Sequence, residues 1–239
     1  MRSVSEPGPV TGQPVGAQVD ATPARRPAPV TLDGRYGRVE RLAQHHGAGL
    51  WKAVNGQDRV WTYMSYGPFA DFPAFSEWVA GRVKLDDPYS YAIIHGSGQA
   101  VGIATLMEIR PAMRVIEVGN IVYSSALQRT PLGTEAQYLL ARYAFETLGY
   151  RRYEWKCNAL NAPSRRAALR YGFVFEGILR QHMIAKGRNR DTAYYSMLDS
   201  EWPARKAAFE RWLAPENFDA DGKQRVSLSA LNAARELSG

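Results

Sequence analysis

The sequence predicts one mixed domain of the α/β (α+β) class, spanning residues 33–200. Short runs rich in β-branched and aromatic residues, typical of strands, are interleaved with segments whose apolar residues recur at helical spacing. Neither an internal repeat nor a low-complexity linker interrupts these residues, so one shared core is expected. Of the 239 residues in the chain, 45% are hydrophobic and 11% are aromatic, which is sufficient for a sizeable core.

Residues 1–32 are predicted to form a disordered tail rich in Pro, Ala and Gly. They include no aromatic residue and show no sustained periodicity. Such a segment cannot bury enough apolar surface to offset the entropy that it loses on ordering. We therefore expect an extended, poorly packed segment that ends near Asp33 and Gly34.

The first half of the domain is predicted to place a strand and two helices before three further strands. Apolar side chains recur at helical spacing from Phe75 to Val83, and Pro73 fits the first turn of that helix. Two β-rich runs flank a glycine-containing turn at 96–98, which is the pattern of a hairpin. In order, we expect a strand at 37–42, helices at 43–56 and 71–85, a hairpin at 89–110 and a strand at 114–124.

The strand at 114–124 has a glycine in its interior, Gly119, and is expected to pair with the second strand of the hairpin. Glycine weakens a strand unless the backbone bulges or another group approaches closely at that position. We therefore expect a bulge or a close approach at Gly119.

The second half of the domain is predicted to alternate helices and strands and then to close with a hairpin. Ala136, Leu140 and Ala144 share one face of the first helix, and Gly149 ends it. In order, we expect a helix at 133–149, a strand at 151–158, a helix at 161–172 and a hairpin at 173–198. Residues 201–239 are predicted as an amphipathic helix at 201–213 and a tail, with the helix packed on the domain or on a second subunit.

Composition excludes several classes of protein. No apolar run reaches the roughly 18 residues that cross a bilayer, and no apolar segment of a signal peptide is seen near the first residues. The lone cysteine, Cys157, excludes an internal disulfide framework and a cysteine-based zinc site, which favours a cytoplasmic location. His45 and His46 are expected to point to different helix faces and to lack further ligands, so no metal is expected.

The formal net charge of +7 is spread along the chain rather than gathered in one block. Nucleic-acid binding needs clustered Lys and Arg, so we do not expect it. The charge instead suits an anionic small molecule or an acidic substrate surface.

The loop at 124–132 leads directly into the helix that is predicted to begin near Gly133. The first N–H groups of a helix are unpaired, and they lie at the positive end of its dipole, so they can bind an anion such as phosphate. Gly133 allows the anion to approach the backbone, while Pro131 and Thr134 keep the turn compact. The structural alternative is an ordinary strand-to-helix turn.

The next helix begins with two polar residues, Asn161 and Ser164, which also follow a predicted strand. Asn161 is a good N-cap, and Ser164 is a plausible partner for it in the first turn. Beside a helix N-terminus, both side chains can also reach a ligand.

These segments resemble the GNAT N-acetyltransferase family, and within it the RimJ/RimL-like branch of ribosomal-protein N-terminal acetyltransferases. The resemblance lies in QRTPLGTEA (128–136), NAPSRRAALRYGF (161–173) and EGILRQHMIAKGRNRDTAYYSML (176–198), and it covers about residues 33–200. It implies a mostly antiparallel central sheet with one splayed pair of parallel strands and with helices on both faces. It also implies acetyl-CoA as co-substrate and no metal.

The resemblance assigns residues to the co-substrate. In the family, a loop of the form Q/R-x-x-G-x-G/A binds the pyrophosphate of acetyl-CoA through backbone amides, and here Pro131 replaces the first glycine. The pantetheine arm is expected between the splayed strands, along the edge near Ile121 and Tyr123 and opposite the strand that ends at Asn158. The expected cofactor-binding residues are Ile121, Tyr123, Gln128, Arg129, Leu132, Gly133, Thr134, Asn161 and Ser164.

Acetyl transfer to an amine needs a base for the ammonium and a proton donor for the leaving thiolate. By resemblance, Ser164 is the expected donor, because Ala168 stands where many relatives have a tyrosine. Glu117 on the bulged strand is the first candidate for the base, against the alternative of an exposed strand carboxylate. His182 is the second candidate, against the alternative of a histidine that only fills a half-buried strand position.

We therefore expect an N-acetyltransferase that acts on a primary amine by direct attack in a ternary complex. The branch resemblance favours a protein or peptide N-terminus as acceptor, and a small amine such as an antibiotic or polyamine is the alternative. A non-catalytic CoA-binding regulatory module is a further alternative, and a homodimer is possible.

Overall fold

The computed structural model describes residues 5–8 and 10–236. Its main feature is an eight-stranded sheet in the order β3-β4-β5-β6-β7-β8-β10-β9. In this described part of the chain, every neighbouring pair is antiparallel except β7 and β8, which are parallel. The strands are β3 (Thr31–Asp33), β4 (Gly37–Arg41), β5 (Tyr89–His95), β6 (Ala100–Arg110), β7 (Val115–Tyr123), β8 (Arg152–Asn158), β9 (Val174–Ala185) and β10 (Arg188–Leu198).

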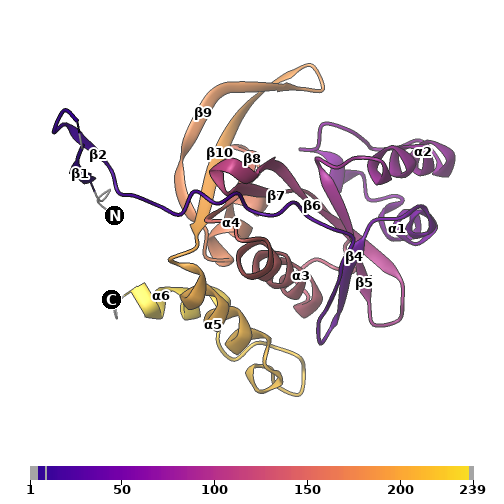
Figure 1. Cartoon of the computed structure of the whole chain (residues 1–239). Helices are drawn as coiled ribbons and strands as arrows, with labels where there is room; N and C mark the ends of the chain where they lie inside the picture. The colour runs from indigo at the N-terminus through magenta and orange to yellow at the C-terminus, as the bar shows by residue number, and fades with distance from the viewer. Residues whose placement is uncertain (1–4, 9, 237–239) are drawn as a thin grey trace.

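Helices cover both faces of the sheet, as the sequence predicts (Figure 1). Tyr91 and Ile93 of β5 belong to the core beneath α3, α4 and α5, whereas Ala92 and Ile94 belong to the core beneath α1 and α2. Because successive residues of a strand point to opposite faces, β5 carries both cores. The helices are α1 (Gly47–Val54), α2 (Phe72–Val83), α3 (Pro131–Arg142), α4 (Ala162–Arg170), α5 (Trp202–Leu213) and α6 (Leu228–Glu236).

The two parallel strands separate at their carboxyl ends. Pairing of β7 with β8 runs from Val115↔Arg152 to Val118↔Trp155, and residues 119–123 and 156–158 continue beyond it. At this place β7 has one extra residue opposite β6, and Asn120 has a left-handed backbone with φ 48°. The predicted bulge beside Gly119 is therefore confirmed, and so is the expected splayed pair.

Within residues 1–32, the described part is more ordered than the poorly packed tail that the sequence predicts. β1 (Ser5–Pro7) and β2 (Pro14–Gly16) form an exposed hairpin, and the chain then runs along the domain. The N–H groups of Ala24 and Arg25 donate to the carbonyls of Pro111 and Leu148. Composition alone does not reveal such contacts, because they use backbone groups rather than side chains.

The C-terminal segment packs on the same domain. Trp202, Phe209 and Trp212 of α5 join the core that α3 forms with the sheet, and Leu228 of α6 joins it too. The sequence predicts that the amphipathic helix packs either on the domain or on a second subunit. The structure shows that it packs on the domain. None of the helices in the described residues is long and apolar enough to cross a membrane.

Candidate active site

Helix α3 begins at Pro131, two residues before the position that the sequence predicts. Thr130 is the N-cap: its Oγ1 accepts a hydrogen bond from the Gly133 N–H at 3.1 Å and donates to the Leu127 carbonyl at 2.7 Å. The prediction missed this cap, although Thr followed by Pro is a recognisable helix start. The Gly133 amide, expected to face an anion, is therefore used within the loop.

Three other amides form the candidate anion site. Among the described residues, the N–H groups of Arg129, Thr130 and Leu132 have no hydrogen-bond partner, and Pro131 has no N–H to offer. Thr134 lies inside the helix, where its N–H donates to Thr130 and its Oγ1 accepts from Arg170. The free donors thus lie before and around Pro131, at the positive end of the helix dipole.

Gly133 has a packing role at this helix start. A Cβ at Gly133 would lie 2.7 Å from the Leu127 carbonyl oxygen and 3.3 Å from Cε2 of the Tyr123 ring. Any side chain here would push α3 away from the loop before it. Gly133 therefore sets the position of the free amides even though its own amide is occupied.

The open edge of β7 is connected to this loop by side chains. The Tyr123 hydroxyl donates to the Gly133 carbonyl at 2.9 Å and accepts from Gln137, and burial raises the pKa of that hydroxyl well above its usual range. The Gln128 side chain donates to the Tyr123 carbonyl at 2.8 Å, so this carbonyl is occupied. Ile121 lies in the bulge, between the paired positions of Gly119 and Val122.

Ser164 lies at the start of α4. It contacts one face of the sheet, and Glu117 points to the other face. The Asn161 side chain accepts from the Ser164 N–H at 3.1 Å, which confirms the predicted N-cap. The Ser164 Oγ accepts from Trp155 Nε1 at 3.0 Å, and Trp155 is the last paired residue before β8 separates from β7. Because Oγ accepts this bond, its proton can be donated to another group, and the Cys157 thiol is one such neighbour.

Cys157 follows on the same strand, and its thiol is buried. Burial raises the pKa of the Cys157 thiol, although a hydrogen bond with Ser164 opposes the rise. A thiol held protonated is a poor nucleophile. This agrees with direct transfer rather than transfer through an acetylated cysteine.

Glu117 is buried, not an exposed strand carboxylate. Only 5% of its surface is accessible, and its Oε2 lies 3.0 Å from the Lys156 ammonium. Burial raises the pKa of Glu117 to about 7, while Lys156 opposes the rise. The carboxylate therefore has the pKa of a useful base at neutral pH.

A second carboxylate, Glu154, lies opposite Glu117 on β8 and differs from it in charge environment. Glu154 contacts Lys156 at 3.1 Å and also Arg110 and Arg152, both at 2.7 Å. Burial raises its pKa, but these cations outweigh burial and hold the pKa of Glu154 below its usual value. Two neighbouring carboxylates thus have opposite shifts, and Glu117 is the one suited to exchange a proton.

Lys156 was not predicted from the sequence. It alternates with Glu154 along β8, and this spacing places both side chains on one face of the sheet. That spacing was a usable signal, but the contact with Glu117 depends on the parallel pairing of β7 with β8.

His182 lies apart from Glu117. It is exposed on β9, its Nδ1 lies 3.0 Å from the Thr192 hydroxyl, and its ring packs edge-on against Tyr194. Lys156 Nζ lies 5.0 Å from the centre of the Tyr194 ring, so Tyr194 contacts both His182 and the partner of Glu117. The structure therefore places Glu117 in contact with Lys156, whereas His182 contacts Thr192 and Tyr194.

The loop at 55–71 reaches over the separated strand ends. The Tyr66 hydroxyl donates to Asn120 Oδ1 in the bulge at 3.2 Å, and the Tyr63 hydroxyl donates to the Leu160 carbonyl at 3.1 Å. Lys186, at the tip of the β9–β10 hairpin, donates to the Trp61 carbonyl at 2.9 Å. These contacts hold the loop over the face of the sheet that carries Glu117.

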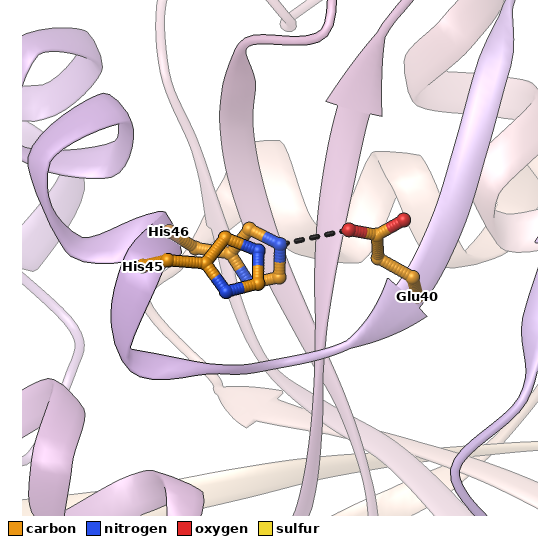
Figure 2. Close-up of side chains that lie close together, drawn as sticks. All are labelled: Glu40, His45 and His46. Carbon is orange, nitrogen blue, oxygen red and sulfur yellow. Dashed lines mark hydrogen bonds and ion pairs between the residues drawn. The ribbon is translucent and has the colours of Figure 1, made fainter.

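His45 and His46 lie closer together than expected, and they do have a third neighbour. Figure 2 shows both rings beside Glu40 of β4, with His46 Nε2 2.8 Å from Glu40 Oε1. His46 Nδ1 accepts from the Ala43 N–H, so Nε2 carries the proton of the neutral ring. Burial lowers the pKa of His46, and its one lone pair is already used. This cluster therefore suits a structural link between β4 and α1 better than a metal site.

Comparisons with known proteins agree with this geometry. Residues 38–174 match the family model described as Acetyltransferase (GNAT) domain. YdaF of Bacillus subtilis (strain 168), whose name refers to ribosomal N-acetyltransferase activity, is 28% identical over 175 residues, which cover 70% of this chain and 90% of YdaF. A ribosomal-protein-serine acetyltransferase of Escherichia coli (strain K12) is 27% identical over 174 residues, which cover 68% of this chain and 93% of that protein.

A solved structure is similar over almost the whole domain. The crystal structure of a GCN5-related N-acetyltransferase from Brucella melitensis has a TM-score of 0.87 and 48% sequence identity. The match covers 90% of this chain and 99% of that one. The chain belongs to the GNAT acetyltransferase family and is an N-acetyltransferase.

Proposed function

We propose that this enzyme transfers the acetyl group of acetyl-CoA directly to a primary amine, with Glu117 as base and Ser164 as proton donor. The observation that carries the proposal is the Glu117 carboxylate, buried where β7 and β8 begin to separate and with its pKa raised to about 7. A base of this pKa is half ionised near neutral pH and can accept a proton from an arriving ammonium.

The co-substrate site follows from the free backbone groups. The N–H groups of Arg129, Thr130 and Leu132 are the donors that fit a pyrophosphate, and the exposed Arg129 side chain adds a positive charge beside them. Residues 119–123 and 156–158 continue beyond the last β7–β8 pair, and an extended arm would bind along these backbone edges, which do not pair with each other. When bound, acetyl-CoA supplies the activated thioester.

The proposed chemistry balances over two protein groups. Glu117 takes a proton from the acceptor ammonium, and the neutral nitrogen attacks the thioester carbonyl. The C–N bond forms and the C–S bond breaks. The Ser164 hydroxyl gives its proton to the departing thiolate and regains a proton from the nitrogen, which must lose its second proton to become a neutral amide, and Glu117 then releases its proton to solvent. The Trp155 N–H holds Ser164 Oγ in place, and Lys156 opposes the rise that burial causes in the pKa of Glu117.

We propose a protein or peptide N-terminus as the acceptor. The names of two relatives refer to ribosomal acetylation, and the contacts of Tyr63, Tyr66 and Lys186 hold the loop at 55–71 beside the separated strand ends, where an extended chain end would approach. A small amine remains the second candidate. We also propose a cytoplasmic location, which the single reduced cysteine fits.

The test compares acceptors directly. The purified enzyme is given acetyl-CoA with a panel of N-terminal peptides, the same peptides with blocked N-termini, and a panel of polyamines and aminoglycosides. Release of CoA with the free peptides alone supports the proposal, whereas release with small amines alone selects the second candidate. Absence of CoA release with every amine would contradict acetyl transfer by these residues.

A further inference from the structure

Glu154 gathers most of the positive charge that lies near the proposed base. Among the described residues, three cations contact its carboxylate: Arg110 and Arg152, both at 2.7 Å, and Lys156 at 3.1 Å. In the same part of the chain, Glu117 contacts one cation, Lys156, at 3.0 Å. The two buried carboxylates therefore share one lysine, and Glu154 alone has further cations beside it.

The ammonium of Lys156 lies between the two carboxylates and contacts Oε2 of each. Burial would lower the pKa of Lys156, but the carboxylates of Glu117 and Glu154 outweigh burial and raise it, so the side chain is held as the cation. Only 12% of the Lys156 side chain is exposed, and a charge in such a place is screened little by salt or water. One cation thus serves two anions, and neither anion receives the whole of its attraction.

The carboxylate of Glu154 is held in a fixed position by the two arginines. Arg110 approaches from β6, and Arg152 lies on β8 itself. Arg152 is also fixed, because its Nη1 donates to Glu176 of β9 at 2.8 Å, and Glu176 accepts from the Ser196 hydroxyl at 2.6 Å. Residues of four strands therefore restrain Glu154, which makes it a firm anchor for an ammonium.

The other oxygen of Glu117 faces the bulge of β7. Oε1 lies 3.0 Å from the place that a Cβ on Gly119 would occupy, so a side chain at Gly119 would crowd it. No residue in the described part of the chain donates a hydrogen bond to Oε1, whereas Oε2 contacts Lys156. Oε1 is therefore the oxygen with lone pairs available for a proton from the acceptor.

We propose that Glu154 is a positioning residue for acetyl transfer, because it holds the Lys156 ammonium between two carboxylates and prevents it from pairing fully with Glu117. The inference rests on the proposed role of Glu117 as the base. A carboxylate that has a cation to itself is a weaker base than one that shares it. By sharing the ammonium, Glu154 leaves Glu117 better able to accept a proton.

The charged groups that act on Glu117, within the described residues, come from two strands. Lys156 and Glu154 lie on β8, and Glu108 lies on β6. Burial raises the pKa of Glu117, Lys156 lowers it, and the like charges of Glu108 and Glu154 raise it. Glu154→Gln removes one like charge and leaves the ammonium to Glu117 alone, and both changes lower the pKa of Glu117. Loss of Lys156 would act in the opposite direction.

The experiment follows the ionisation of Glu117 in the resting enzyme by ¹³C NMR of labelled glutamate carboxyl groups, with the signal assigned by its loss in Glu117→Gln. The wild-type midpoint is expected at about pH 7. In Glu154→Gln the midpoint should fall by about 1 pH unit, the scale of a neighbouring charge. The acidic limb of kcat/KM, measured with one N-terminal peptide as acceptor, should fall with it. The plateau should also be lower, because a weaker base takes the proton less readily.

Three further variants separate positioning of the ammonium from general damage to the fold. Glu154→Asp keeps the charge and should have a midpoint closer to that of the wild type. Glu176→Gln makes the same substitution where the carboxylate contacts Arg152 and Ser196 rather than Lys156, and it should leave the midpoint in place. When Lys156→Met is already present, adding Glu154→Gln should lower the midpoint by less than it does in the wild type, because the ammonium that Glu154 holds is gone.

A Glu154→Gln midpoint that stays in place or rises would overturn the proposal. An equal fall with and without Lys156 would also overturn it, because Glu154 would then act on Glu117 directly and not through the ammonium. A midpoint that falls while the limb of kcat/KM does not move would contradict Glu117 as the base, and hence the proposed function, but not the effect of Glu154 on Glu117. A midpoint and a limb that fall together support both.

Discussion

The carboxylate of Glu117 lies 3.0 Å from the ammonium of Lys156, across the last paired residues of β7 and β8. This contact links β7 to β8 at the proposed site. Glu117 belongs to the bulged strand, and Lys156 is the first residue of β8 beyond the pairing. The balance between burial and this one cation sets the pKa of the candidate base.

Replacing Lys156 is expected to move the pH dependence of the enzyme. A cation favours the ionised carboxylate, so Lys156→Met should raise the pKa of Glu117 above about 7 and shift the acidic limb of kcat/KM to higher pH. A shift of one pH unit lowers the rate on that limb about tenfold. Activity should recover at alkaline pH, where Glu117 ionises again.

Lys156→Arg is the matched control, because it keeps the positive charge beside Glu117 and Glu154. Its limb should lie close to that of the wild type. A Lys156→Met limb that coincides with the wild type would show that Lys156 does not act on the base.

Adding a methyl group at Gly133 is expected to weaken acetyl-CoA binding. The new Cβ would lie 2.7 Å from the Leu127 carbonyl, so α3 and the free amides before it must move. Gly133→Ala should cost about 1 to 3 kcal/mol of binding free energy, the scale of displaced charge-assisted hydrogen bonds. Titration calorimetry measures this directly.

Gly81→Ala in α2 provides the comparison, because a Cβ there meets nothing within 4 Å. It should leave acetyl-CoA affinity unchanged and slightly stabilise the helix. Equal acetyl-CoA affinities for the two variants would argue against an anion site at this loop.

Removing the Ser164 hydroxyl is expected to lower turnover more than co-substrate affinity. Its role is assigned to the departing sulfur, so Ser164→Ala should reduce kcat and leave the Kd of acetyl-CoA nearly unchanged. With an acetyl thioester of a more acidic thiol, the leaving group needs less protonation and the defect should shrink. A defect of the same size with both thioesters would contradict proton donation by Ser164.

Local signals in the sequence were sufficient for much of the fold. The turn at 96–98, the N-cap at Asn161 and the end of the helix at Gly149, with φ 82°, each depend on a few adjacent residues. Gly119 indicated the bulge for the same reason, because glycine weakens a strand unless the backbone bulges or another group approaches closely. The family resemblance then supplied the parallel pairing, which no local pattern contains.

Contacts between distant segments could not be predicted in this way. The burial of Glu117 and its pairing with Lys156 arise only when β7 lies beside β8. Residues 24–30 lie along the domain through bonds of their backbone N–H groups, such as the bond from the Ala28 N–H to the Tyr143 hydroxyl. Composition cannot predict such bonds, because every residue except proline has a backbone N–H. The predicted start of α3 at Gly133 is two residues late, because Thr130 caps the helix and Pro131 occupies its first turn.

His182 provides a useful contrast with Glu117. It is exposed on β9 and does not contact the Glu117 carboxylate, so His182→Gln should keep the wild-type pH profile and most of the turnover. A loss of the acidic limb in His182→Gln would make the histidine the base instead.

The pH profile of kcat/KM for Glu117→Gln, measured beside the wild type with one peptide acceptor, tests the central claim most directly. Glutamine keeps the shape and a hydrogen-bonding group but cannot accept the proton. Turnover should therefore fall about 100-fold or more near pH 7, the usual contribution of a positioned base. The loss should shrink as pH rises, because more of the amine arrives neutral, and the limb near pH 7 should disappear. A Glu117→Gln profile that superimposes on the wild type, with the variant shown to be folded, would contradict the assignment of Glu117 as the base.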